Sequence, residues 1–527
     1  MSKMLKSSGG IGIATMVSRV LGLVREQVYA AFMGTGPVAD AFFYAFMGPN
    51  LFRRLLGEGA LTASFIPIFK AKEKSSGEAA MWRAANAVIS ALVAASSFVA
   101  VAAVALITIA LSFNIWKQET RLMFELMRFM FPYMVLACFA AVLIGICNAR
   151  GHFFIPALGA ALLNVVMIAS VLLLAPRMGD TLSKQVFALA IGVIVAGVAQ
   201  ALFQFPTLRR EGFRFQWISP LGDPVVREVL RRMIPSSIGV AAFQINVVLT
   251  QSLAFGEHHG IVADFNYAVR LMELPQGVVG VSLATFMLPT LAGLAVEKNF
   301  HQFRATIREG VNYLLFVNLL ASVLLFTLAE PIIRLLFERG RFHPEATSRV
   351  SIALICLVPG LMSFSLVNIL ARAFYALEDT STPAKISIAC LTLNIILTAF
   401  LLFGFNLGAG ALGLANSVTS FCNLSLLLFA LRKKLKTLEL RPCVAQFPAL
   451  FAAAAAAGLA AWGLRVLWDS RFGHGTLPAK LGEVFVPMAA AALIYLVLTF
   501  CLKVPAAHDV LALVRSRAPR VTSSGGG

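Results

Sequence analysis

Long apolar runs separated by short polar segments dominate this chain. An α-helix needs about 20 residues to cross the hydrocarbon core of a bilayer, and most of the runs reach that length. Several contain Gly or Pro, which membrane helices tolerate when neighbouring helices satisfy the freed backbone groups. We predict fourteen spans, at residues 10–33, 39–68, 85–113, 123–149, 153–175, 185–206, 233–255, 263–294, 308–330, 347–375, 383–404, 408–431, 443–464 and 482–502.

Composition supports the same fold class. Of 527 residues, 59% are hydrophobic and 13% are charged, and the mean hydropathy is +0.83. Soluble domains carry about 25% charged residues. We therefore predict an all-α polytopic membrane protein.

The net charge of +19 raises the question of nucleic-acid binding. Lys and Arg occur mainly in short segments between apolar runs rather than on one soluble face, so nucleic acid is not an expected partner. Cytoplasmic loops of membrane proteins are enriched in these residues. With the N-terminus inside, most loop Lys and Arg fall on the inner side, which predicts that both termini are cytoplasmic.

An internal repeat relates the two halves of the chain. Val38-Ala39-Asp40 resembles Val262-Ala263-Asp264, Pro132 and Pro156 correspond to Pro359 and Pro383, and Leu208-Arg209-Arg210 corresponds to Leu431-Arg432-Lys433. Six spans per copy give parallel repeats about an axis along the membrane normal, an architecture of transporters. The predicted divisions are an N-lobe at 1–220, a C-lobe at 221–440, an appendage of two further helices at 441–505 and a cytoplasmic tail at 506–527.

Motifs of enzymes are not found in the cytoplasmic loops. HExxH, Walker A and nucleophile-elbow patterns are missing, which disfavours an enzyme and an ATP-driven pump. The seven cysteines form no CxxC pair, and most lie in apolar runs as small fillers, so we expect no disulfide framework and no metal site. No cofactor is predicted, and the sequence does not identify a coupling cation.

The segment 18–59 places charged residues inside predicted membrane helices. A charge at the centre of the hydrocarbon costs about 2.5–3.5 kcal/mol on insertion scales, so such residues usually face a bundle interior or a watery cavity. Three arginines here, Arg19, Arg25 and Arg53, are our candidates for a cationic substrate cavity. Guanidinium binds phosphate through parallel hydrogen bonds, so these residues suit a diphosphate.

The first span has two polar faces. Ser18, Gly22 and Arg25 share one face, and Arg19 and Glu26 share its neighbour. The two arginines lie about 120° apart on a straight helix, so both reach one cavity only if it is wide or the helix bends at Gly22. In the alternative interpretation, Glu26 neutralises Arg19 or Arg25 in a structural pair.

The second span is expected to break at Pro49. Arg54 and Glu58 stand at i,i+4 spacing and suit a structural salt bridge, which leaves Arg53 as the better ligand. Asp40 lies near the outer end of this span. It either pairs with a cavity arginine, closes an outer gate or caps a helix.

The second lobe offers Arg270 in an apolar run of the span that corresponds to span 2. We expect Arg270 to complete the cavity from the other side, although Glu273 at i,i+3 can pair with it. Buried amides are more often interhelical hydrogen-bond residues than ligands. This applies to Asn148, Asn164, Asn246, Asn368, Asn394, Asn416 and Asn423, and span 7 with Gln244, Asn246 and Gln251 offers the best exceptions.

Together these residues resemble the MurJ/MviN lipid II flippases of the multidrug/oligosaccharidyl-lipid/polysaccharide exporter superfamily. The resemblance covers essentially the whole chain. It is best at Ser18-Arg19-Val20-Leu21-Gly22 with Arg25, Asp40-Ala41-Phe42-Phe43, Pro49-Asn50 with Arg53-Arg54 and Glu58-Gly59, and Tyr267-Ala268-Val269-Arg270-Leu271-Met272-Glu273-Leu274-Pro275. The family commonly has an acid where Val269 stands, so the partner of Arg270 differs here.

The resemblance implies a flippase that moves lipid-linked peptidoglycan precursor across the bacterial inner membrane by alternating access. The positions matching Arg19, Arg25, Arg53 and Arg270 would line a cationic cavity, and the head group would enter through a lateral gap near Glu58. The last two helices would form a groove for the polyprenyl tail, although their small residues also suit tight packing. Implied partners are the precursor, membrane lipids and proteins of cell-wall synthesis or division.

Two other functions fit the same predicted fold. One is an ion-coupled exporter of drugs or of another lipid-linked oligosaccharide, for which the arginines would be dispensable in cell-wall synthesis. The other is a membrane scaffold for cell-wall enzymes, which has no need of arginines inside membrane helices.

Overall fold

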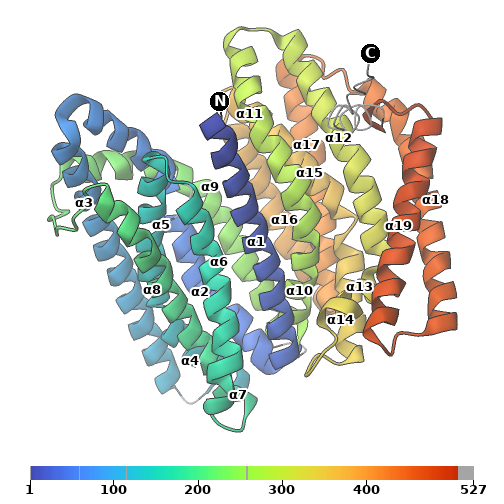
Figure 1. Ribbon diagram of the computed structural model, residues 1–527, viewed down its shortest axis with the longest axis horizontal. Coiled ribbons are helices and arrows are strands. Elements are labelled where there is room, and N and C mark those ends of the chain that lie inside the picture. The colour runs from blue at the N-terminus through green and yellow to red at the C-terminus, as the bar shows by residue number, and fades with distance from the viewer. Residues whose placement is uncertain (1, 58–59, 114, 257–258, 508–527) are drawn as a thin grey trace, which may run out of the picture. The chain divides into compact units, whose positions relative to one another are not determined.

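The computed structural model describes residues 2–57, 60–113, 115–256 and 259–507. Within these ranges the regular structure is helical, without strands (Figure 1), so the all-α prediction is confirmed. The α-helices are α1 (Ser2–Met33), α2 (Pro37–Leu56), α3 (Ala60–Ser112), α4 (Gln118–Met130), α5 (Tyr133–Ala149), α6 (Phe154–Ala169), α7 (Leu182–Gln185), α8 (Phe187–Arg210), α9 (Pro224–Ala254), α10 (Ile261–Pro275), α11 (Ser282–Val296), α12 (Phe300–Thr327), α13 (Ala329–Phe337), α14 (Pro344–Leu357), α15 (Gly360–Ala376), α16 (Ser381–Phe405), α17 (Ala409–Leu435), α18 (Arg441–Phe472) and α19 (Leu477–Cys501). Short helices η1 (Ser170–Leu174), η2 (Ala175–Arg177) and η3 (Gln276–Val281) extend α6 and join α10 to α11.

Many of these helices are long and apolar enough to cross a membrane. Among the described residues eight qualify, or up to ten if each of the bent pairs α4–α5 and α14–α15 forms one span. Helices α1 and α2 are not among the eight. The count of fourteen spans therefore stays a prediction, while the polytopic helical class stands.

Two details of the helices differ from the sequence prediction. The predicted break at Pro49 is wrong, because α2 continues through Pro49 to Leu56. The predicted span 39–68 corresponds to α2 together with the start of α3. Helix α3 contains a non-helical residue, Gly77 (φ 81°, ψ 177°), which separates its beginning from the apolar stretch predicted at 85–113.

The chain divides into two compact units, which are described separately. Unit 1 comprises Met1–Asp264 and Phe337–Ala346, and unit 2 comprises Phe265–Leu336 and Thr347–Gly527. The predicted lobe boundaries at 220 and 440 stay a prediction.

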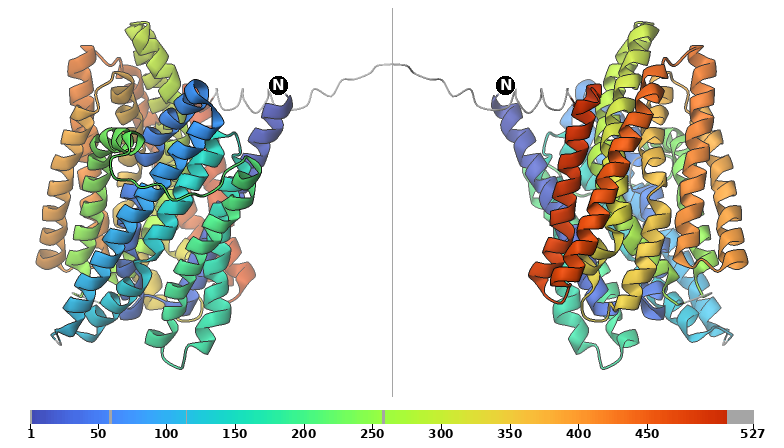
Figure 2. Two further views of the ribbon diagram at one scale, coloured as in Figure 1. Left: turned by 90° about the vertical axis from the view of Figure 1, so that its left-hand side faces the viewer. Right: turned by 90° about the vertical axis from the view of Figure 1, so that its right-hand side faces the viewer.

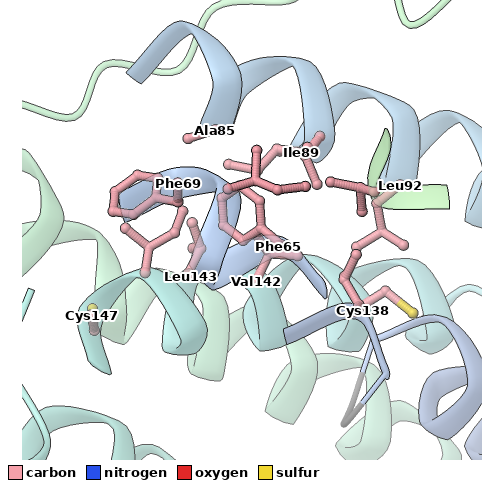
Figure 3. Packing of buried hydrophobic residues seen from close by; sticks show 14 of the residues in the cluster. Phe65, Phe69, Ala85, Ile89, Leu92, Cys138, Val142, Leu143 and Cys147 are labelled. Carbon is pink, nitrogen blue, oxygen red and sulfur yellow. The ribbon is translucent and has the colours of Figure 1, made fainter. Parts of the chain in front are cut away.

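The core of unit 1 lies where α5 packs between α3 and α8 (Figure 1). Figure 3 shows Phe65, Phe69 and Ile89 of α3 against Leu143 and Cys147 of α5. These side chains are almost completely buried. Cys147 fills space between larger residues, as expected for a small apolar filler.

The segment 337–346 is far along the chain but belongs to unit 1, where it packs on the turn between α1 and α2. The Arg341 N–H donates to the Ala31 carbonyl at 2.9 Å. Gly34 and Gly340 both have positive φ, and a Cβ at either would lie 2.3 Å from a carbonyl oxygen of the opposite turn. Only glycine permits this close approach.

The last two helices of unit 2, α18 and α19, run side by side (Figure 2). Helix α18 also packs on α12, and the Tyr495 hydroxyl of α19 donates to the Phe316 carbonyl of α12 at 2.8 Å. The buried face of α18 is built from Ala453, Ala454 and Ala457, so its small residues allow close helix packing here.

Candidate functional site

Arg25 is held in unit 1 by groups from two helices. Its Nη2 forms an ion pair with the neighbouring Glu26 of α1, and its Nη1 donates to Asn164 Oδ1 of α6 at 3.0 Å. The guanidinium carbon also lies 5.5 Å from the centre of the Tyr29 ring. Glu26 therefore neutralises Arg25, which is one of the two pairings that the alternative interpretation of the sequence allowed.

Asn164 fixes the position of α6 on α1. Its Nδ2 donates to the Ser18 carbonyl at 3.1 Å, while its Oδ1 accepts from Arg25. Helix α1 continues as one helix through Gly22, whose hydrogens face the same amide: an added Cβ would lie 3.7 Å from Asn164 Nδ2. Ser18, Gly22 and Arg25 thus share one face, as predicted. Arg19 is exposed, off this face.

The arginines of α2 lie in its last turn. Arg53 Nε donates to Asn50 Oδ1 at 2.9 Å, a bond within the same helix. Arg54 is half-buried beside it. The expected Arg54–Glu58 pair falls outside the described residues, as does Glu58 itself.

Asp40 is buried and caps a helix other than its own. Its Oδ2 accepts from the Gly260 N–H and its Oδ1 from the Ala263 N–H, both at 2.7 Å. These N–H groups lie at the start of α10, where the unpaired amides favour a negative charge. One turn further along α2, Tyr44 bonds Ser252 of α9 and stacks on Phe255 with ring centres 5.1 Å apart. Asp40 thus anchors the start of α10 to α2.

Arg270 belongs to unit 2. Its Nη1 lies 2.8 Å from Glu273 Oε2, and about half of each side chain is exposed. The expected i,i+3 pair is confirmed, and Glu273 serves as the partner that Val269 cannot provide. The convergence of Arg270 with the arginines of unit 1 stays a prediction.

The interhelical role expected for the buried amides holds for some of them. Asn164 joins α6 to α1, and Asn394 of α16 donates to Thr419 Oγ1 of α17 at 3.1 Å. The expected interhelical role is wrong for Asn368 and Asn416 as far as their described bonds go, because both amides donate to carbonyls of their own helices. In α9, Gln244, Asn246 and Gln251 are all buried.

Sequence reasoning missed a ring of four charged residues in unit 2. Arg334 Nη1 lies 2.9 Å from Glu483 Oε1, and its Nη2 lies 2.6 Å from Glu330 Oε1. Arg465 closes the ring by contacting both carboxylates. The side chain of Glu483 is 1% exposed although it lies in the candidate span α19. A carboxylate inside an apolar run was the signal that would have found this ring.

These features indicate the class of protein. Arginines and carboxylates held inside the membrane helices of a polytopic helical protein are typical of transporters. Two solved structures share the fold. One, described as a lipid II flippase MurJ in an inward closed conformation, has a TM-score of 0.72 at 23% identity and covers 95% of this chain and 99% of its own. An inward-facing multidrug resistance transporter of the MATE family has a TM-score of 0.63 at 16% identity, with 80% and 95% covered.

Sequence relatives identify the family. The model of the lipid II flippase MurJ family matches residues 29–482, so the chain belongs to that family. It is 33% identical over 438 residues to a probable lipid II flippase MurJ of Vibrio cholerae, covering 81% of this chain and 82% of the relative. It is also 33% identical over 429 residues to the lipid II flippase MurJ of Burkholderia cenocepacia, covering 80% and 82%.

Proposed function

We propose that this protein flips lipid II from the cytoplasmic to the periplasmic leaflet of the bacterial inner membrane and thereby supplies peptidoglycan synthesis. The observation that carries this proposal beyond family membership is Arg25. Its charge sits in a predicted membrane helix and is oriented by Asn164 of another helix. Such an arrangement is costly in an apolar bundle and is usually kept for a substrate or ion pathway.

The diphosphate of the substrate is the expected ligand of the arginines. Arg25 is already paired with Glu26, so substrate binding requires the guanidinium to share or exchange that partner. Arg53 donates through Nε to Asn50, and a guanidinium binds phosphate through parallel hydrogen bonds, so we include Arg53 in the proposed diphosphate site. Arg19 and Arg270 complete the proposed set, with Ser18, Glu26, Arg54, Glu58 and Glu273 in supporting or gating roles.

Transport is proposed to proceed by alternating access, with Asp40 at the outer gate. In the predicted orientation the turn between α1 and α2 is periplasmic. Asp40 and Tyr44 hold the start of α10 and the end of α9 there, and Arg341 holds the α1–α2 turn. Opening toward the periplasm would break these few hydrogen bonds. The membrane potential supplies energy, with or without a coupling cation.

The test is rescue of cells depleted of their own flippase, with Arg25→Ala and Arg53→Ala at matched membrane levels. Accessibility of lipid II at the outer leaflet is measured. We expect both variants to leave lipid II inside. The matched control is Arg121→Ala, which removes an arginine from an exposed i,i+4 pair on α4 and should rescue.

Full rescue by both variants would show that the arginines have a structural role. The exporter or the scaffold function would then be favoured over the flippase. Loss of rescue by Arg121→Ala as well would show that any arginine substitution disturbs the protein. The proposed cell-wall partners would be sought by crosslinking in the same strains.

A further inference from the structure

A groove runs along the seam between α6 and α8 in unit 1, apart from the arginines discussed above. Its volume is about 520 Å³. The apolar lining comes from Ile155 and Leu162 of α6 and from Ala199, Leu202, Phe203 and Pro206 of α8. Thr207 and Arg210, in the last turn of α8, also line the groove. We propose that this groove binds one acyl chain of an anionic phospholipid whose phosphate contacts Arg210.

The dimensions of the groove suit a lipid chain in one leaflet. The lining residues of α8 recur at helical spacing on a single face between Ala199 and Arg210. Eleven residues of α-helix rise about 16 Å. One leaflet contributes about half of a hydrocarbon core that is about 30 Å thick. The groove therefore extends from the interface to about the middle of the bilayer.

The surroundings of the groove indicate contact with lipid. Leu202 on its rim is 62% exposed, and Val198 and Val195 on the same helix are 39% and 48% exposed. Both helices belong to candidate membrane spans. Exposed apolar side chains on a membrane span are expected to face lipid acyl chains. A phospholipid of the surrounding membrane is therefore the expected occupant of the groove.

The charge at the groove's end favours an anionic headgroup. Arg209 and Arg210 are both exposed at the end of α8. Arg210 lines the groove and is exposed, and a long arginine side chain lets its guanidinium reach the interface. The next residue, Glu211, already has other partners: Arg150 Nε lies 2.8 Å from its Oε2, and His152 Nε2 lies 2.9 Å from its Oε1. Guanidinium binds phosphate in a bidentate fashion.

The proposal is independent of flipping and is tested by binding. Full-length protein in detergent is mixed with phosphatidylglycerol or phosphatidylethanolamine of identical acyl chains, and bound lipids are counted by native mass spectrometry. We expect Arg210→Ala to lower retention of phosphatidylglycerol about fivefold. Ala199→Phe, which fills the groove, should lower it similarly without changing any charge.

Lys433→Ala is the matched control, since Lys433 corresponds to Arg210 in the repeat and is also exposed near the end of a helix, α17. It should leave retention unchanged. Leu202→Glu adds a like charge at an exposed rim position and should weaken binding even if Ala199→Phe proves unstable. The proposal fails if Lys433→Ala lowers retention as much as Arg210→Ala, if neither groove variant lowers it, or if phosphatidylethanolamine binds equally well.

Discussion

At the scale of single residues, the Asn164 side-chain amide makes two hydrogen bonds between helices at the same time. It bonds the α1 backbone through Nδ2 and orients Arg25 through Oδ1. A hydrogen bond to a charged group contributes about 1.5–3 kcal/mol. We predict that Asn164→Ala lowers the rate of lipid II flipping about tenfold, the factor that corresponds to about 1.4 kcal/mol.

The matched control is Asn394→Ala, which removes an interhelical amide bond to Thr419 but touches no arginine. Flipping is measured with lipid II in proteoliposomes, and stability by thermal unfolding of the same preparations. We expect both variants to lose similar stability and only Asn164→Ala to lose rate. Equal loss of rate in both would contradict an orienting role for Asn164.

Asp379 gives a prediction on pH at a residue outside the membrane spans. Burial opposes its ionisation, but Lys434 Nζ at 2.7 Å and the N–H and hydroxyl of Thr382 outweigh burial and lower the pKa of Asp379 to about 2. A lowered pKa in the folded state means that the carboxylate stabilises the fold above its unfolded pKa of about 3.9. This stabilisation is lost as the pH falls through the folded pKa.

We therefore predict that Asp379→Asn destabilises the protein by about 1–2 kcal/mol at pH 7, and that the difference from the parent shrinks as the pH falls from 5 toward 3. Thermal unfolding in detergent across this range measures the difference. A difference that stays constant down to pH 3 would show that the carboxylate charge is not responsible.

At the scale of helices, the ring of Glu330, Arg334, Arg465 and Glu483 ties α13 to the hairpin α18–α19. Removing one partner of a buried ion pair costs about 3–5 kcal/mol, because it leaves an uncompensated charge. We predict that Arg334→Ala destabilises unit 2 by this amount. The pair Arg334→Met with Glu483→Leu should cost less than Arg334→Ala, since Arg465 and Glu330 still neutralise each other.

Unfolding temperatures of the single and paired variants decide this prediction. Breaking the exposed Arg121–Glu125 pair of α4 provides the control, and should cost no more than about 0.5 kcal/mol. A paired variant less stable than Arg334→Ala would show that specific hydrogen bonds, rather than the unpaired charge, hold the hairpin.

The helices were predictable from sequence because length and apolarity suffice to define a membrane span. Pro49 misled the prediction, since α2 loses only one internal hydrogen bond there and continues as a helix. The Arg25–Glu26 pair could be predicted only as one of two alternatives, because adjacent residues lie about 100° apart on a helix and only the flexible side chains bring them together. The cap of α10 by Asp40 and the charge ring join residues more than 100 positions apart, which local spacing cannot reveal.

At the scale of the whole molecule, orientation and span count remain to be tested together. Lys and Arg near α8 and α17 predict that the segments after these helices are cytoplasmic. We predict that a membrane-impermeant thiol reagent applied from outside labels Asp180→Cys and Gly475→Cys but not Arg214→Cys. The exposed Cys501 is first replaced by alanine.

Asp180 follows the fifth predicted span and Gly475 the thirteenth, so an even number of spans separates them and both must be labelled from the same side. Labels on opposite sides would refute the predicted count in this part of the chain. Labelling of Arg214→Cys alone would show that the orientation is opposite to the predicted one. The Asp40 contacts would then lie on the cytoplasmic side. The parent carrying Cys501→Ala must still rescue depleted cells, which ties the measured topology to an active protein.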